Sequence, residues 1–186
     1  MSLNMIKKAS VTLAATLVLS ASAALAAGGG GPALKTQNWS FNGPTGTFDR
    51  AQVQRGYQVY SEVCAGCHSL KYVRFGNLPA IGFSEAEAKA IAAEFEAEDG
   101  PDDDGEMFMR PARLSDAMPS PFANDKAARA SNNGALPPDL SLIAKARVGG
   151  ADYVYSLLMG YSDAPEGHEV AEGMNYNAWF PGTQIA

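Results

Sequence analysis

Two cysteines three residues apart, followed at once by a histidine, restrict what this chain can fold into more than any other feature. The segment reads Cys64-Ala65-Gly66-Cys67-His68 and holds both cysteines of the 186-residue chain. A disulfide is the default for a lone cysteine pair in an exported protein. Here it would close a loop of only four residues, Cys64 to Cys67, and so would constrain the unfolded chain very little. The motif therefore points to another use of the two thiols.

Covalent haem attachment accounts for all three side chains of the motif. The thiols of Cys64 and Cys67 can add to the two vinyl groups of a haem while the imidazole of His68 turns to the iron. Two other uses stay open. A redox dithiol shares the spacing, but such a pair opens a helix after a buried strand, and no apolar β-branched strand precedes Cys64. A zinc site needs further ligands, which this chain hardly offers.

A bound haem iron either takes a second axial ligand or keeps an open face. His168 is the one histidine outside the motif, and it lies in a loop rich in glycine and acidic residues, 164–173. Methionine thioethers are the other candidates, although a methionine is more often a packing or surface residue than a ligand. Those outside the N-terminal segment are Met107, Met109, Met118, Met159 and Met174. The residues alone do not choose among these candidates.

The first residues follow the order of a secretory signal. Lys7 and Lys8 precede an apolar run over residues 9–19, and small residues ending in Ala24-Leu25-Ala26 follow. We expect a signal peptide over residues 1–26. A retained membrane anchor is the competing interpretation, but the run is short for a membrane span.

After the signal peptide we expect a flexible leader over residues 27–46, which is rich in glycine and has no apolar face, and then one domain over residues 47–186. Removing the signal peptide takes two lysines from the 14 basic groups and none of the 20 acidic ones, which leaves a net charge of −8. A chain this acidic is not expected to bind nucleic acid.

Capping residues and apolar periodicity predict several helices. They begin after the capping residues Asp49, Ser84 and Asp139, a short one spans residues 124–131, and a last one spans residues 153–159. Glycine and proline predict a loop over 76–82, the acidic residues predict a solvated loop over 96–106, and three prolines predict extended backbone within 107–123. No alternating strand pattern is present. The predicted fold class is therefore mainly α with long irregular loops, as expected when a cofactor supplies much of the core.

Four further segments carry a resemblance to a known family. MFMRP at 107–111, ASNNGALPPDLS at 130–141, RVGGADYV at 147–154 and NAWFPG at 177–182 resemble the cytochrome c1 family of the cytochrome bc1 complex, in its bacterial type. The similarity runs from about Trp39 to Ala186. It implies a class I cytochrome c-like haem domain that works beside cytochrome b. It also implies that the haem takes electrons from the Rieske iron-sulfur protein and passes them to a soluble cytochrome c.

The same resemblance implies a set of pocket residues around the haem. Asn132, Ala135, Leu136, Pro137 and Pro138 would line the haem, Arg147 would pair with a propionate, and Tyr153, Leu157, Leu158 and Phe180 would form walls. Adjacent prolines offer rigid backbone without a donor, and a guanidinium can hold a carboxylate with two hydrogen bonds. From the residues alone, an ordinary turn, a surface salt bridge and core aromatics are the favoured explanations of these positions.

One departure from the family pattern concerns the end of the chain. In the family an axial methionine follows the Phe-Pro-Gly segment by a few residues, and a membrane-spanning helix comes later. Here the sequence ends at Ala186, soon after Gly182, so in that register the sixth ligand would be the next residue. We expect a fragment that stops before its sixth ligand and its membrane anchor. The whole protein is expected on the periplasmic side of the bacterial inner membrane.

Three questions stay open at the level of sequence. A soluble periplasmic c-type cytochrome is the main alternative function, and a haem enzyme such as a peroxidase is a second, although no distal acid–base pair is evident. Residues 85–106 hold ten of the 20 acidic groups against one base, Lys89. This run is either a solvated surface or a means of attracting a basic partner.

Overall fold

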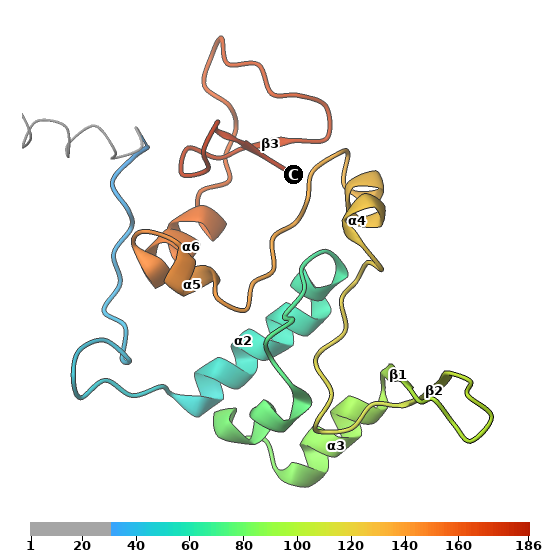
Figure 1. The fold of residues 1–186 in the computed structure, drawn as a ribbon. Helices are drawn as coiled ribbons and strands as arrows, with labels where there is room; N and C mark the ends of the chain where they lie inside the picture. Colours follow the sequence, from blue (N-terminus) through green and yellow to red (C-terminus); the bar gives the residue numbers. More distant parts are fainter. Residues whose placement is uncertain (1–30) are drawn as a thin grey trace, which may run out of the picture.

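The computed structural model describes residues 31–186 (Figure 1), so the predicted signal peptide lies outside the described residues. Within them the structure is mainly helical, which confirms the predicted fold class. The α-helices and 3-10 helices (η) are α2 Arg50–Glu62, η2 Cys64–Gly66, η3 Phe75–Ile81, α3 Glu85–Ala93, α4 Asp125–Ser131, α5 Ile143–Ala146 and α6 Gly150–Leu158. Two antiparallel strand pairs are β1 Glu96–Asp99 with β2 Phe108–Pro111, and β3 Asn175–Tyr176 with β4 Gln184–Ile185. In this part of the chain no helix combines the length and the apolarity needed to span a lipid bilayer.

Helix α2 begins where the sequence predicts and leads directly into the cysteine motif. The carboxylate of Asp49 accepts the backbone N–H of Gln52 at 3.2 Å, which satisfies one of the free amides of the first turn. The predicted stripe of Val53, Tyr57 and Tyr60 forms the less exposed face of the helix. The stripe turns toward the segment before α3, where the ring of Tyr57 meets that of Phe83 edge-on.

The main hydrophobic core lies between η3 and α3. The predicted capping box starts α3, with Ser84 Oγ accepting the N–H of Glu87 and the Glu87 carboxylate accepting the N–H of Ser84. Ala88 and Ala92 are fully buried in the core cluster. Alanine has no side-chain atom beyond Cβ, so this face of α3 can approach its neighbour closely.

The predicted loop over 76–82 is wrong in part, because most of it is the short helix η3. Phe75 and Leu78 are 1% and 2% exposed. In a 3-10 helix, side chains three residues apart project in the same direction, so one turn buries both against α3. Their burial stabilises a helical turn despite Gly76 and Pro79.

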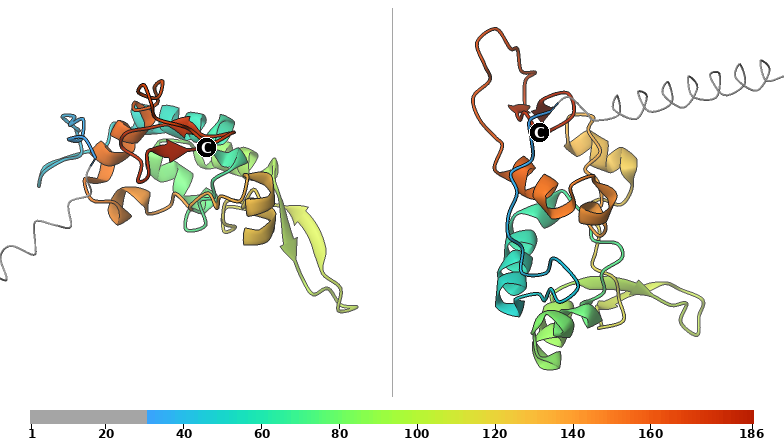
Figure 2. Two further views of the ribbon diagram at one scale, coloured as in Figure 1. Left: turned by 90° about the horizontal axis from the view of Figure 1, so that it is seen from above. Right: turned by 90° about the vertical axis from the view of Figure 1, so that its left-hand side faces the viewer.

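The predicted solvated loop over 96–106 is also corrected, because residues 96–99 form strand β1. β1 pairs with β2 in a hairpin that projects from the rest of the molecule (Figures 1 and 2). At its base the guanidinium of Arg110 binds the carboxylates of Asp99 and Asp116, the second at 2.6 Å. The Arg110 hydrogen bonds lower the pKa of Asp116 to about 2. Residues 96–99 form a strand instead of a loop because they pair with β2. β2 lies in the segment after residue 107 for which the sequence predicted extended backbone.

The remaining helices start partly as predicted. The side chain of Asn124 caps α4 by accepting the N–H of Ala127 at 3.0 Å. Asp139 does not cap the next helix, because α5 begins later with Leu142 as its N-cap residue. Helix α6 starts at Gly150, three residues earlier than predicted, after Gly149 with φ of 88°.

Part of the predicted leader is attached to α6. The N–H of Lys35 donates to Ser156 Oγ at 2.8 Å. The Asp152 carboxylate accepts the backbone N–H of Gln37 at 3.0 Å and the indole N–H of Trp39 at 2.7 Å. The composition of the leader did not indicate these contacts. The domain boundary at residue 47 stays a prediction.

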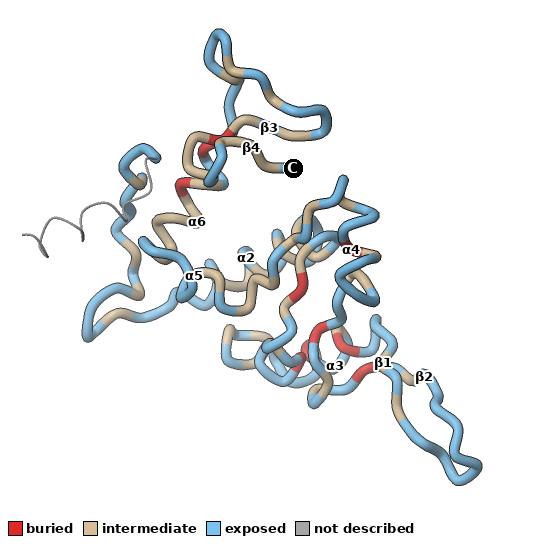
Figure 3. The backbone as a smooth tube through the Cα atoms, turned by 45° about the horizontal axis from the view of Figure 1, so that its top comes forward, coloured by how far each residue is buried: buried red, intermediate tan, exposed pale blue. Residues whose placement is uncertain are grey.

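Most buried positions fall into two groups of different character. Figure 3 shows one group around α3 and another beside the end of α6. The first is the apolar core, whereas the second contains the buried polar side chains of Ser156 and Asn177, both 0% exposed. The described core is therefore concentrated on the α3 side of the molecule.

Candidate haem site

The cysteine motif forms one tight turn at the end of α2. The N–H of Cys67 donates to the carbonyl of Cys64 at 3.1 Å, and the N–H of His68 donates to the same carbonyl at 2.8 Å. Cys64 is half-buried, Cys67 is exposed, and both thiols are free rather than joined in a disulfide. The turn follows a helix instead of opening one after a strand, which is not the arrangement of a redox dithiol.

The imidazole of His68 is held by a carbonyl from a distant part of the chain. Its Nδ1 lies 2.8 Å from the carbonyl oxygen of Pro138, 70 residues away. A carbonyl can only accept, so Nδ1 carries the proton and the lone pair of Nε2 is left for a metal ion. Histidines that bind metals are commonly oriented by a hydrogen bond of this kind.

The segment that follows His68 is bound to the segment that follows Pro138. Asp139 Oδ2 accepts the hydroxyl of Ser69 at 2.7 Å and the N–H of Lys71 at 2.8 Å, and its Oδ1 accepts the N–H of Ser141 at 3.0 Å. Desolvation raises the pKa of Asp139, but the hydrogen bonds from Lys71, Ser141 and Ser69 outweigh it and lower the pKa to about 2. Asp139 is therefore a charged acceptor at neutral pH.

A second hydrogen bond holds the backbone of His68 itself. The hydroxyl of Tyr60, on α2, donates to the carbonyl of His68 at 2.9 Å. Burial raises the pKa of Tyr60, with smaller contributions from Asp139, Tyr57 and Cys64, so the phenol keeps the proton that it donates. The histidine is thus positioned from two sides, by α2 and by the Pro138 segment.

A cavity of about 360 Å³ brings the motif together with part of the predicted pocket. It is lined by Cys67 and by Leu136, Pro137 and Pro138. These last three residues follow Cys67 by about 70 positions in the chain. The rest of the lining is mixed, with the polar residues Ser69, Lys71, Ser120, Asn124, Asp125 and Asp139 and the apolar residues Pro121, Phe122, Ala123 and Ala128. The structure thus places the Leu-Pro-Pro segment beside Cys67, and the haem-lining role of this segment stays a prediction.

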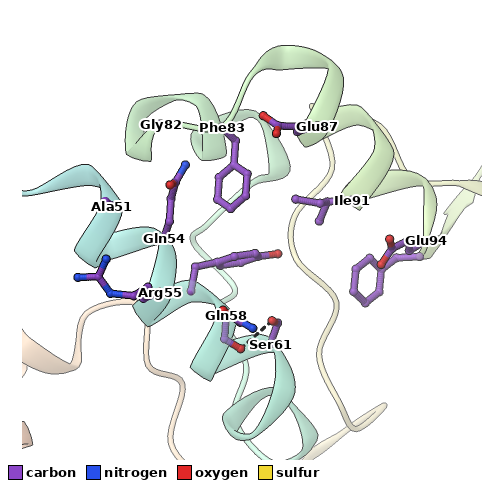
Figure 4. A pocket seen from close by; sticks show the side chains of 12 residues that line it. Ala51, Gln54, Arg55, Gln58, Ser61, Gly82, Phe83, Glu87, Ile91 and Glu94 are labelled. Carbon is purple, nitrogen blue, oxygen red and sulfur yellow. Dashed lines mark hydrogen bonds between the residues drawn. The ribbon is translucent and has the colours of Figure 1, made fainter.

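A larger cavity lies elsewhere and contains none of the predicted site residues. Its volume is about 630 Å³, and it opens between α2 and the α3 region (Figure 4). Gln54 and Gln58 of α2 face Phe83 and Ile91 across it. No residue of the cysteine motif lines this larger cavity, whereas Cys67 lines the smaller one, so we place the candidate site at the smaller cavity.

The donor set fits a haem better than a zinc ion. Within residues 31–186 no three His, Cys, Asp or Glu side chains gather closely enough to hold a metal ion. A haem needs only the two thiols and the imidazole of the motif. Apolar side chains next to the motif are exposed, with Val63 at 71% and Leu136 at 37%. A bound macrocycle would cover apolar surface of this kind.

The other predicted pocket residues have clear positions but no described contact with the motif. Asn132 is the C-cap residue of α4, and its side-chain N–H donates to the carbonyl of Ala128. The backbone carbonyl of Asn132 accepts the N–H of Ala135. Arg147 is exposed at the end of α5. The rest lie on or near α6, with Tyr153, Leu157 and Phe180 half-buried and Leu158 exposed. Their roles stay predictions.

The alternative axial ligands lie in several different environments. His168 Nε2 is 3.1 Å from the hydroxyl of Thr183, and the ring meets Tyr176 edge-on. Met118 is 6% exposed in the main core, whereas Met107, Met109 and Met159 are exposed on the surface. None of these arrangements marks the residue as a ligand.

Four positioning residues were not identified as such from the sequence. Tyr60 was assigned to the apolar face of α2, Asp139 to a helix cap, and Ser69 and Asn177 had no assigned role. For Asp139, the one available signal was the order Pro-Pro-Asp. The two prolines before the aspartate have rigid backbones, which restricts where its carboxylate can lie. Nothing in the local pattern indicated which distant groups it would bind.

Comparison with known proteins places these features in one family. The model of the Cytochrome C1 family matches residues 39–186. This chain is similar to cytochrome c1 of Rhodospirillum rubrum, with 50% identity over 98% of the chain and 72% of that protein. It is also similar to the mitochondrial cytochrome c1 heme protein of Schizosaccharomyces pombe, with 57% identity over 75% of the chain and 45% of that protein.

A relative with a different name supports the same family assignment. The mitochondrial cytochrome b-c1 complex catalytic subunit of Candida albicans is 54% identical over 80% of this chain and 52% of that protein. The chain therefore spans about half the length of the mitochondrial relatives that it matches.

Proposed function

Because this chain belongs to the cytochrome c1 family, we propose that it carries one covalent haem c and transfers electrons as a subunit of a cytochrome bc1 complex. The observation that carries this proposal is the arrangement of three side chains. Two free thiols lie on one turn, and the next residue, His68, has its Nδ1 bound to Pro138 and its Nε2 available.

Each residue of the site has a separate task in this proposal. Cys64 and Cys67 would hold the macrocycle through thioether bonds, and the Nε2 atom of His68 would bind the iron. Pro138 keeps the imidazole in one orientation and in the tautomer that can ligate. Leu136 and Pro137 present apolar surface that excludes water. When bound, the haem supplies a one-electron couple, while the protein sets its potential and its exposure.

The partners and the location follow from the resemblance together with family membership. The Rieske iron-sulfur protein would donate the electron, cytochrome b would be the neighbouring subunit, and a soluble cytochrome c would accept the electron. The whole protein would be anchored at the periplasmic side of the inner membrane. The name of the Candida albicans relative, a subunit of a b-c1 complex, supports this assignment.

Haem attachment can be tested on protein that is exported together with a c-type haem maturation system. The denatured chain is expected to keep its red colour and to show the added mass of one haem. Cys64→Ser and Cys67→Ser should each remove one thioether bond and shift the pyridine haemochrome band. Colourless protein with free or mutually oxidised thiols would overturn the proposal and favour a dithiol or metal site.

The assignment of the axial histidine has a matched control in the same chain. His68→Ala should lose haem or change its spin state, whereas His168→Ala should keep the wild-type spectrum. Loss of the spectrum in His168→Ala instead would identify the second histidine as a ligand. Membership of the complex is tested separately, because affinity purification of the whole protein from membranes should recover cytochrome b and the Rieske protein with it.

A further inference from the structure

The hydrogen bond between His68 and Pro138 is flanked by a second connection between the same two segments. Ser69 directly follows His68, and Asp139 directly follows Pro138. The Ser69 hydroxyl donates to Asp139 Oδ2 at 2.7 Å, and the N–H of Leu140 donates to the carbonyl of Ser69 at 2.9 Å. Two adjacent residues on one segment are thus bound to three adjacent residues on the other.

Asp139 is the centre of this connection. Its carboxylate accepts the N–H of Ser141 in its own segment. It also accepts the hydroxyl of Ser69 and the N–H of Lys71 in the other segment. The Ser141 hydroxyl extends the contact by accepting the N–H of Tyr72 at 3.1 Å. Among the described residues no lysine or arginine side chain forms a salt bridge with Asp139. The charge of Asp139 is therefore balanced by N–H and O–H dipoles of both segments.

We propose that Asp139 is a positioning residue for the axial imidazole, holding the carbonyl of Pro138 at Nδ1 of His68 and thereby setting the reduction potential of the haem. The inference rests on the proposed haem function. A histidine whose Nδ1–H is firmly bound is a stronger electron donor to iron, which favours the oxidised form. A nearby carboxylate acts in the same direction. Loss of Asp139 should therefore raise the potential.

Three variants of the full haem-bearing protein test this positioning role. Asp139→Asn replaces a carboxylate oxygen with an NH2 group, which would face an N–H donor on one of the two segments. Ser69→Ala removes one cross-segment hydrogen bond and leaves the carboxylate charge in place. The matched control is Asp152→Asn, because Asp152 also accepts two N–H groups, from Gln37 and Trp39, but has no described contact with the His68 segment.

Redox titration provides the main measurement. Asp139→Asn is expected to change the ratio of reduced to oxidised protein at a fixed potential by about threefold or more, which is about 30 mV for a one-electron couple. Ser69→Ala should shift the midpoint in the same direction by less, and Asp152→Asn should leave it unchanged. The Nδ1 proton of His68, followed by NMR, should exchange with solvent faster in Asp139→Asn and Ser69→Ala only.

Each outcome bears on a different claim. If wild-type protein holds no covalent haem, the proposed function fails before this test begins. If haem is attached and neither Asp139→Asn nor Ser69→Ala moves the midpoint or the Nδ1 exchange beyond the Asp152→Asn control, the positioning role is wrong. Should Asp139→Asn fail to fold, Ser69→Ala decides the question alone, because it alters one hydroxyl.

Discussion

Asn177 provides the sharpest test of how the C-terminal segment is held against α6. Its side chain is 0% exposed, its amide N–H donates to the carbonyl of Leu157 at 2.8 Å, and its amide oxygen accepts the N–H of Trp179 at 3.1 Å. Its own carbonyl accepts the N–H of Phe180 at 3.1 Å. Asn177 thus connects two of the predicted pocket residues, Leu157 and Phe180.

The cost of Asn177→Ala follows from what each partner loses. The carbonyl of Leu157 keeps a second donor, the N–H of Gly160 at 3.1 Å, so its loss is small, about 1 kcal/mol. The N–H of Trp179 loses its described acceptor, and an unsatisfied buried donor costs about 2 kcal/mol. Together these losses predict a decrease of about 3 kcal/mol in the free energy of unfolding.

Urea denaturation followed by circular dichroism measures this difference, provided that the m-value is unchanged and unfolding is two-state. The matched control is Asn175→Ala, because Asn175 is exposed on the neighbouring strand β3; it should change stability by less than about 0.5 kcal/mol. A loss of under about 1 kcal/mol for Asn177→Ala, or an equal loss in both variants, would refute the reasoning.

Three further predictions concern other parts of the molecule. Gly160→Ala should destabilise the protein by about 2 kcal/mol or more, because a Cβ there would lie 2.4 Å from the Trp179 ring and 2.6 Å from a backbone oxygen; thermal unfolding tests this, and a wild-type Tm would contradict it. The lowered pKa of Asp139, about 2 against the ordinary 3.8, means that its stabilisation is complete above about pH 4 and is lost as the pH falls through about 2. The stability difference between wild type and Asp139→Asn, measured by urea at each pH, should therefore shrink over that window, and a constant difference would contradict it. Neutralising residues 102–104 to asparagine should slow reduction of a basic soluble cytochrome c at low ionic strength but not at high; an unchanged stopped-flow rate at low salt would exclude attraction by the hairpin tip.

Local patterns predicted the helix starts well. Asp49 and Ser84 each cap the helix that the sequence assigned to them. A cap joins atoms only two or three residues apart, so its geometry is contained in a short stretch of sequence. The attachment motif is equally local, because the turn at Cys64 places both thiols and the imidazole within five residues.

Pairings between distant segments were not predictable in the same way. The acidic stretch over residues 96–106 has the composition of a solvated loop, yet its first four residues pair with β2, which supplies the backbone partners. Asp139 is of a residue type that commonly caps helices. Its carboxylate instead binds the backbone and a hydroxyl of a segment about 70 residues earlier. An aspartate accepts N–H groups equally well in either place, so only the fold decides which ones it meets.

The residue order around Cys64 is enough to place two thiols and an imidazole together on the end of a helix, because one turn of backbone brings them there. Which carbonyl orients that imidazole, which carboxylate holds the carbonyl and which amide attaches the C-terminal segment to α6 became known only from the folded chain. Contacts within a turn depend on residue type and spacing, whereas contacts across 20 or 70 residues depend on how the whole chain closes and packs.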